Sequence, residues 1–229
     1  VSIAKDEPFI LDEKTIADAV RDEEKKFEED AIKGLYEQVR GQDIRMIERE
    51  VVRVLLNGYE TETPYDKYAK SAELSLYMSI IPERILAGVQ KLAKDHLHTD
   101  SVLFHTFPLS FFAATTKLFP HNDDYLLIDV AGESTDISAV RNGTIEHTNS
   151  SRAGRNALLR TIMEDLHVTE EIAFSYLHLD ATEGASGDHK VRLEASITKY
   201  MDIWKAQVQA LLVAIQKTGV VPHVGFVLC

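Results

Sequence analysis

The stretch from 125 to 166 constrains the fold of this chain more than any other part of the sequence. An apolar run there leads into a small polar turn, and further apolar runs and a helical pattern follow. The expected elements are a strand at 125–130, a turn at 131–136, strands at 137–140 and 145–148, and a helix to about Leu166. The Asn-Gly pair at 142–143 favours a tight hairpin turn between the last two strands. The order predicts a meander of strands followed by a helix.

The polar turn holds the candidate site. Asp129 ends the first strand, and Gly154 opens a helix in which Leu158, Ile162 and Leu166 recur every four residues. A buried strand that delivers an acid into a polar turn is how many α/β sites present a carboxylate to a metal–phosphate ligand. Helix N-termini carry unpaired N–H groups, so a glycine there can admit a phosphate. We expect Asp129, Gly154 and the turn residues to converge on one cleft; the turn residues are Gly132, Glu133, Ser134, Thr135 and Asp136.

An ordinary structural turn is the alternative for the same residues, because Asp, Gly, Ser and Thr are all common in turns. On its own, the string D-x-x-G-x-S-T-D at 129–136 favours that structural interpretation. The ordered series of strand, acidic turn, strand, hairpin, strand and helix favours a nucleotide site. Both interpretations stay open on the residues alone.

The composition is that of a soluble globular protein. The chain has 45% hydrophobic and 27% charged residues. Its length of 229 residues is enough for one large or two small domains. Its 25 basic and 37 acidic residues give a formal charge of -12, which argues against nucleic acid or an anionic membrane surface as its partner. A single cysteine, Cys229, excludes an internal disulfide and fits a reducing compartment. The chain begins without Met and stops inside an apolar run, so we expect an internal fragment of a longer protein.

The first hundred residues predict a small α+β unit. Residues 1–10 fit an edge strand marked by Pro8, and Asp12 is a plausible N-cap for a helix that ends near Gly41. Strand patterns follow at 44–56, with an Asn-Gly turn at 57–58. Strict alternation of apolar and polar residues at 71–80 predicts a half-buried strand of an antiparallel sheet.

Helices dominate the remaining predictions. Pro82 opens a helix at its first turn, with an inner stripe of Ile85, Leu86, Val89, Leu92 and Ala93. A short strand at 102–105, a helix at 108–118 and another at 170–177 are expected, with a flexible linker at 183–187. A last long helix carries a core stripe and stops at 218–219; the stripe is Ile197, Met201, Trp204, Val208, Leu211 and Ile215.

Other catalytic chemistries lack their motifs. The nine histidines are scattered, and none forms H-E-x-x-H; His96 and His98 diverge from one another beside a helix end. The sequence has no Walker G-x-x-x-x-G-K and no G-x-S-x-G elbow, and Cys229 has no evident partner base. Metal hydrolysis and nucleophilic catalysis are therefore not predicted.

The series from Asp129 to Gly154 resembles the second phosphate loop and following helix of the actin-like ATPase superfamily, with FtsA and PilM as the most similar members. The resemblance extends along nearly the whole chain. It implies a mixed α/β and α+β protein, an actin-like (ribonuclease-H-like) lobe with an inserted small α+β subdomain. Residues 1–100 would be the insert, 101–124 a strand and helix of the first lobe, and 125–229 the second lobe.

The resemblance also implies roles for the candidate residues. Asp129 would hold Mg²⁺ through water, and its change to Asn would weaken or abolish hydrolysis. The backbone from Gly132, Glu133, Ser134 and Thr135 to Asp136 would face the β- and γ-phosphates of ATP, and Gly154 would approach the nucleotide from the helix. Ala131 and Glu133 replace glycines of the family, and they disfavour ATP by restricting φ and by adding a negative charge. ATP and Mg²⁺ binding, and a weak ATPase activity, are therefore left open.

Three functions follow from the resemblance. The first is an FtsA-like ATP-binding protein of bacterial cell division, which self-associates and links a filament to the membrane through a segment outside this sequence. The second is a PilM-like scaffold of pilus assembly that binds a partner's peptide. The third is a degenerate actin-like interaction module without ATPase activity, which the residues at 131–133 favour. All three place the protein in the cytoplasm, with the first at the inner face of the membrane.

Overall fold

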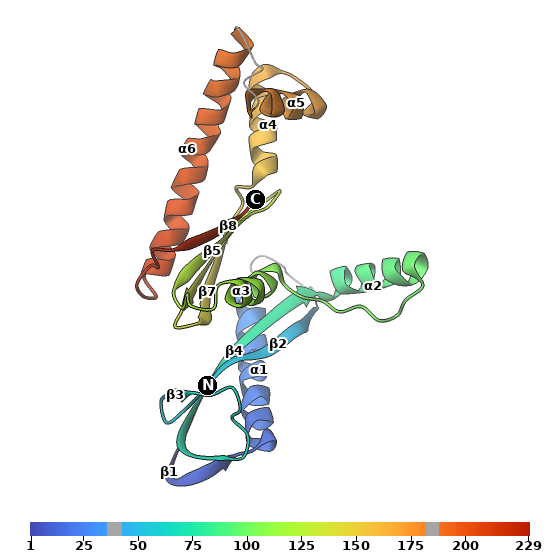
Figure 1. The fold of residues 1–229 in the computed structure, drawn as a ribbon. Coiled ribbons are helices and arrows are strands. Elements are labelled where there is room, and N and C mark those ends of the chain that lie inside the picture. The colour runs from blue at the N-terminus through green and yellow to red at the C-terminus, as the bar shows by residue number, and fades with distance from the viewer. Residues whose placement is uncertain (36–42, 182–187) are drawn as a thin grey trace. The chain divides into compact units, whose positions relative to one another are not determined.

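The computed structural model describes residues 1–35, 43–181 and 188–229, and it describes side chains except at 31–42 and 179–189. The chain divides into two compact units, Val1–Ser110 and Phe111–Cys229. Figure 1 shows the elements of both units, and each unit has its own four-stranded sheet. The linker predicted at 183–187 and the helix end predicted at Gly41 lie outside the described residues. The assignment of 1–100 as an inserted subdomain stays a prediction.

The first unit contains an antiparallel sheet in the order β1-β4-β2-β3. Its strands are β1 (Ser2–Leu11), β2 (Ile44–Leu56), β3 (Tyr59–Glu60) and β4 (Lys67–Pro82). The alternating segment at 71–80 lies inside β4, as its period of two predicts. Pro8 lies in β1, an edge strand whose register shifts between Ala4 and Phe9. An edge strand tolerates proline because the missing N–H is not needed for the ladder.

Helix α1 (Glu13–Leu35) begins where its N-cap residue predicts. The carboxylate of Asp12 accepts a hydrogen bond of 2.8 Å from the backbone N–H of Thr15. This bond satisfies one of the N–H groups that a helix start leaves without an intrahelical partner. Ile16 is buried and Val20 packs on the core. The core of this unit consists of Phe9, Leu11, Ile16, Val54, Leu56, Ala69, Ala72 and Leu74.

The Asn-Gly turn at 57–58 is confirmed. Asn57 and Gly58 have φ of 53° and 84°, as a two-residue hairpin turn of the left-handed type requires. The turn joins β2 to β3, and the side-chain oxygen of Asn57 accepts hydrogen bonds from the N–H groups of Lys70 and Ser71. The turn therefore also fixes the neighbouring strand β4.

Two local predictions in this unit are wrong, and a third is confirmed with a shift of one residue, because the helix expected at Pro82 begins directly after it. Pro82 is the N-cap of α2 (Glu83–Leu97) and still part of β4, because its extended ψ of 129° lets it pair with Ile44. The stripe expected to be buried on α2 is largely exposed: Ile85, Val89 and Leu92 are 45%, 40% and 59% exposed. The strand expected at 102–105 is an unpaired coil. A pattern of apolar residues does not reveal which of them find a partner.

The coil is anchored by Glu48, a buried acid of β2 that the sequence did not single out. Its carboxylate accepts bonds from the hydroxyls of Ser79 (2.7 Å) and Thr106 (2.6 Å), and from the N–H of Thr106 (2.9 Å). His105 Nδ1 lies 3.2 Å away. Burial raises the pKa of Glu48, but the hydrogen bonds from Thr106 and Ser79 outweigh burial, and the net shift is downward. A charged carboxylate thus ties 105–106 to the sheet.

The second unit has a mixed sheet in the order β7-β6-β5-β8. Its strands are β5 (Tyr125–Val130), β6 (Thr135–Arg141), β7 (Thr144–Ser151) and β8 (Gly225–Leu228). The first three form the predicted meander, and Asn142 and Gly143 make its tight turn with φ of 49° and 66°. The last strand pairs with β5 in parallel. Helix α3 (Phe107–Leu118), predicted at 108–118, leads from the first unit into the second.

Three helices complete this unit: α6 (Asp188–Gln216) packs on the sheet, and α4 (Arg155–Leu166) and α5 (Glu170–Ala181) share a second core with α6. The stripe predicted on α6 is confirmed, since Leu211 and Ile215 are buried against Leu126, Ile137 and Ala139. A second core joins α4, α5 and α6 through Ile162, Leu166, Ala173 and Leu193. Figure 1 shows α6 running beside the sheet and α4. This packing places the start of α4 next to the end of β5.

Candidate functional site

The turn between β5 and β6 is a tight hairpin loop. Ala131 N–H donates to the carbonyl of Ser134 at 2.9 Å, and Val130 pairs with Thr135 on either side of the loop. Residues 131–134 are not among the described residues with positive φ. Ala131 and Glu133 therefore fit this turn without strain. The same observation means that the turn lacks the alternating right- and left-handed conformations that form a backbone anion nest.

The start of α4 contacts this turn directly. The N–H groups of Arg155 and Asn156 donate to the carbonyls of Ala131 (2.9 Å) and Gly132 (2.7 Å). The expectation that the helix keeps its first N–H groups free for a ligand is therefore wrong for these two. The structure brings the predicted turn and Gly154 together, but it does so through hydrogen bonds from the two residues after Gly154 to the turn.

Gly154 is required by space rather than by its dihedral angles. Its φ of -115° and ψ of -177° are extended backbone that any residue adopts. A Cβ at this position would lie 2.5 Å from the carbonyl oxygen of Gly132 and 2.6 Å from that of Ala131. Only glycine lets the turn approach the helix this closely. Its predicted role toward a nucleotide stays a prediction.

Two aromatic residues of α6 fix the turn and the helix start from the other side. Trp204 Nε1–H donates to the hydroxyl of Thr135 at 3.0 Å, and that hydroxyl donates to the carbonyl of Ala153 at 2.5 Å. Tyr200 donates to the carbonyl of Gly154 at 2.7 Å. Sequence reasoning assigned Trp204 to a core stripe and missed Tyr200. The sequence signal for the role of Trp204 is that a half-buried indole N–H needs a hydrogen-bond acceptor.

Glu133 bridges the turn and α4 through its side chain. One carboxylate oxygen accepts from Asn156 Nδ2 and Arg160 Nη1, both at 3.0 Å, and the other accepts from Arg160 Nη2 at 2.8 Å. The hydrogen bonds from Arg160, and then that from Asn156, lower the pKa of Glu133 to about 2. Asn156 and Arg160 were not predicted as site residues. A residue pair one helical turn apart beside an acidic turn is the signal that could have found them.

Asp129 and Asp136 are directly opposite each other on β5 and β6. Residues in that relation project their side chains on the same face of the sheet. Burial, and then repulsion from Asp136, raise the pKa of Asp129, and Arg155 opposes this effect. Ser134 donates to Asp136 at 3.2 Å. Two carboxylate oxygens held together in this way are chemically suited to a divalent cation.

A nucleotide with its metal ion can be tested against these contacts. The acid pair fits Mg²⁺ held through water, although the described residues contain no cluster of three or more metal-ligating side chains. The phosphate groups of the nucleotide do not fit this arrangement. The first N–H groups of α4 are bonded to the turn, and the side chains of Asn156 and Arg160 are bonded to Glu133.

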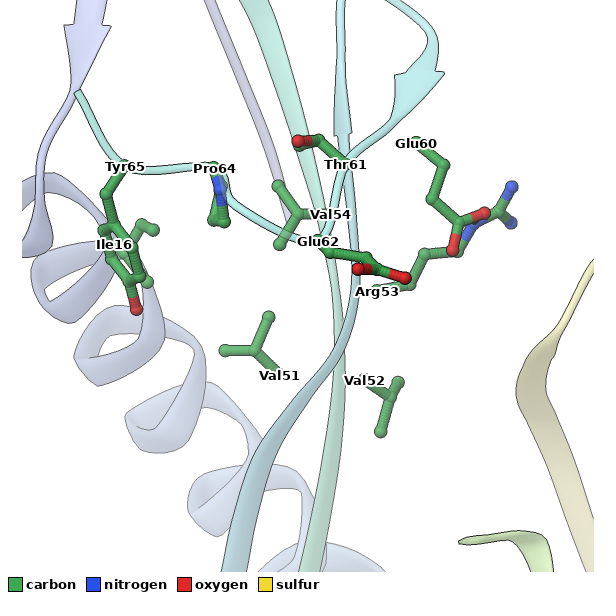
Figure 2. Close-up of a pocket in the computed structure, with 10 residues that line it drawn as sticks. All are labelled: Ile16, Val51, Val52, Arg53, Val54, Glu60, Thr61, Glu62, Pro64 and Tyr65. Carbon is green, nitrogen blue, oxygen red and sulfur yellow. Dashed lines mark hydrogen bonds and ion pairs between the residues drawn. The ribbon is translucent and has the colours of Figure 1, made fainter. Parts of the chain in front are cut away.

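Two surface pockets of the described chain lie elsewhere. One of about 320 Å³ is in the first unit, where β2 and the loop after β3 meet α1, and Figure 2 shows the side chains that line it. Ile16, Pro64 and Tyr65 form one side of it, and the ion pair of Arg53 with Glu60, at 3.2 Å, lies on another. The second, of about 330 Å³, lies between α4 and α6 and includes Asp165, Arg192 and Lys199. Neither pocket is lined by a predicted site residue.

The comparisons with known proteins rest on structure alone, because no family model and no curated protein sequence match the chain. A solved structure described as the PilM–PilN type IV pilus biogenesis complex matches with a TM-score of 0.63 and 13% identity over 99% of this chain. This chain spans 59% of the length of that one.

Two further solved structures match with lower TM-scores. The ethanolamine utilization protein EutJ from Carboxydothermus hydrogenoformans has a TM-score of 0.38 and 15% identity, over 51% of this chain and 39% of that one. A Bacteroides thetaiotaomicron protein with an actin-like ATPase fold has a TM-score of 0.33 and 10% identity, over 76% of this chain and 58% of that one. At these scores they carry no argument.

The fold follows from the first match and the architecture above. The chain has an actin-like fold of mixed α/β and α+β content, as the resemblance of its sequence implied. The likeness to PilM is one of fold, and the part of the prediction specific to FtsA gains no support from it. None of the helices in the described ranges is long and apolar enough to cross a membrane.

Proposed function

We propose that this chain belongs to a PilM-like assembly protein, an actin-fold scaffold that binds a segment of a partner protein. The observation that carries this proposal is the likeness to the PilM–PilN complex over 99% of the chain. That likeness includes the small α+β unit as well as the unit that contains β5 and α4. The partner would be a PilN-like protein, and any contact with the inner face of the membrane would come through a segment outside this sequence.

The contacts of the β5–β6 turn support a scaffold over an active ATPase. Phosphoryl transfer requires hydrogen-bond donors and a metal ion aimed at the phosphates. Here Arg160 and Asn156 donate to Glu133, and the N–H groups of Arg155 and Asn156 donate to the turn. These bonds stabilise the fold of the second unit, and they use up donors that phosphate would need.

Mg-ATP binding is a second candidate function, and the pair of Asp129 and Asp136 favours it. Burial and then the charge of Asp136 raise the pKa of Asp129, and a bound Mg²⁺ would offset the repulsion between the two carboxylates. In this proposal Asp129 holds Mg²⁺ through water, and Gly154 lies near the nucleotide. The backbone of the turn faces the phosphates; its residues are Gly132, Glu133, Ser134, Thr135 and Asp136. Weak ATP hydrolysis would depend on Asp129.

The FtsA-like role in cell division differs from the scaffold in a measurable way. A cytoskeletal ATPase self-associates into filaments in response to nucleotide, whereas a scaffold forms a complex of fixed stoichiometry with its partner. No contact of the described residues favours filament formation, so the division role remains the alternative against which the scaffold is tested.

The test uses the full-length protein and the PilN-like protein from the same genome. Calorimetry and size-exclusion chromatography are run with and without Mg-ATP, and sedimentation measures polymer. We expect a discrete complex whose affinity changes less than about threefold with Mg-ATP, and no sedimenting polymer. Asp129→Asn serves as the matched variant and should form the same complex. Filaments that require Mg-ATP, without a complex with the partner, would overturn the proposal in favour of the FtsA-like role.

A further inference from the structure

Glu133 occupies a set of donors that suits a phosphate group. Arg160 presents two N–H groups to its carboxylate at 3.0 and 2.8 Å, and Asn156 presents a third at 3.0 Å. Both donors belong to α4, where residues four apart share a face. A guanidinium fork has the geometry to bind either a carboxylate or a phosphate with two parallel hydrogen bonds. The cradle of Asn156 and Arg160 is thus an anion site that the chain fills with its own side chain.

We infer that Glu133 is a tethered anion that blocks this cradle, and that a nucleotide phosphate binds Asn156 and Arg160 only after Glu133 has left them. The inference rests on the second candidate function, Mg-ATP binding at this turn. It identifies Glu133 as the residue that decides whether the turn accepts a phosphate.

The position of Glu133 supports this role in two ways. Its side chain is 65% exposed, so it can rotate away from α4 into solvent. The turn that carries it is held separately, by the bonds from Arg155 and Asn156 N–H and by the bond between Ala131 and Ser134. Removal of the Glu133 carboxylate therefore leaves the backbone of the turn supported.

Tethering explains why the block is effective although the ion pair is exposed. A side chain on a short loop competes with a free ligand at an effective concentration in the millimolar range or above. The low pKa of Glu133 also keeps the carboxylate charged throughout the physiological pH range. A phosphate must therefore displace a permanently charged competitor, and it also meets the repulsion of that charge at close range.

The experiment measures the dissociation constant of Mg-ATP by calorimetry for the full-length protein and its Glu133→Ala and Glu133→Gln variants. We expect both variants to bind about tenfold more tightly than the wild type or better, because competition and like-charge repulsion are both removed. A double variant, Glu133→Ala with Arg160→Met, should lose this gain. The same titrations with inorganic phosphate separate the cradle from the rest of the nucleotide site: a gain there as well assigns the effect to the cradle alone.

Glu146→Ala is the matched control, because Glu146 is also an ion-paired glutamate of the same unit, 2.8 Å from Arg141. It changes the net charge equally but leaves the turn intact, so its affinity for Mg-ATP should equal that of the wild type. Equal affinities for the wild type and both Glu133 variants, including no binding by any of them, would overturn the inference. An equal gain in the affinity of Glu146→Ala for Mg-ATP would also overturn the inference. Binding of the partner is measured in parallel for the wild type and each variant. If the wild type does not bind the partner, that result counts against the scaffold function and not against the role of Glu133.

Discussion

The carbonyl oxygen of Gly132 lies 2.5 Å from the position that a Cβ on Gly154 would occupy. The two glycines belong to the β5–β6 turn and to the N-cap of α4, and their close approach allows the carbonyls of the turn to accept the first N–H groups of the helix. The candidate site is therefore a structural joint of the second unit, whatever ligand it binds.

The joint predicts a large cost for Gly154→Ala. The added methyl group would meet two backbone carbonyls, which cannot rotate away as a flexible side chain would. We expect the free energy of unfolding to fall by about 2–4 kcal/mol, measured by denaturant titration. Gly88→Ala is the control, because no atom lies within 4 Å of a Cβ there and the residue is inside α2. That change should be neutral or stabilise by up to about 1 kcal/mol. Equal stability of Gly154→Ala and the wild type would contradict the described joint.

The buried hydroxyl of Thr135 predicts a second effect. Thr135→Val keeps the side-chain volume but leaves the carbonyl of Ala153 and the indole N–H of Trp204 without their partner. We expect a loss of about 1–3 kcal/mol in the free energy of unfolding. Trp204 is the only tryptophan, so its fluorescence emission should also shift in this variant. Ser138→Ala offers a comparison, since Ser138 is a buried hydroxyl on the same strand that bonds only Thr148 among the contacts described, at 2.9 Å. An unchanged emission spectrum in Thr135→Val would argue against the bond to Trp204.

Arg141 predicts the largest effect of a charged residue. Its side chain is 10% exposed and donates to the carbonyls of Val220 (2.7 Å) and Ile215 (3.2 Å), as well as to Glu146. It thereby holds the end of α6 and the segment before β8 on the sheet. Arg141→Met should cost about 2–4 kcal/mol, because it removes the hydrogen bonds of a mostly buried guanidinium to Val220, Ile215 and Glu146. Arg49→Met is the control: Arg49 is 64% exposed and pairs with Glu24, so about 1 kcal/mol or less is expected. Similar losses for the two variants would show that burial does not govern the effect.

The pKa of Glu133 predicts a pH dependence of stability. Its folded-state pKa of about 2 lies below the ordinary value of 4.5, so its interactions stabilise the fold above about pH 4.5. That contribution falls as the pH decreases from 4.5 toward 2, where the carboxylate becomes protonated in the folded state as well. Glu133→Gln should remove this part of the pH dependence, and the unfolding midpoints of the two proteins should converge at low pH. If the unfolding midpoints of the wild type and Glu133→Gln differed by the same amount down to pH 2, the low pKa of Glu133 would be contradicted.

For Asp129→Asn we expect a gain of stability together with the loss of any response to Mg-ATP. Burial and Asp136 raise the pKa of Asp129, which means that its charged form is disfavoured in the folded state. Replacing it should stabilise the ligand-free protein at pH 7 by up to about 1 kcal/mol, the range for opposed like charges on neighbouring strands. The gain should disappear at low pH, where Asp129 is protonated. Any Mg²⁺-dependent thermal shift with ATP should be lost. A destabilised Asn variant at pH 7 would show that the charge of Asp129 is needed by the fold.

Much of the local structure could be predicted from the sequence. The Asn-Gly turns at 57–58 and 142–143, the cap at Asp12, the strand at 71–80 and the stripe of α6 are all confirmed. Each depends on preferences of neighbouring residues for particular φ angles, or on a period of two or 3.6 that one segment expresses alone. The failures on α2 and at 102–105 have the opposite cause, since burial and strand pairing depend on a partner elsewhere in the chain.

The sequence by itself determined which residues stand at the end of β5 and at the start of α4, and it indicated that Asp129, the turn and Gly154 would be neighbours. Only the tertiary structure decided what they do to one another. Packing of α4 on α6 brings the helix start against the turn, so the backbone donors expected to face a ligand bond Ala131 and Gly132 instead. Likewise, the burial of Glu48 follows from the pairing of β2 with β4 and from the hydroxyls of Ser79 and Thr106. Spacing along a chain encodes the faces of its helices and strands, whereas hydrogen bonds between distant side chains depend on how those faces meet.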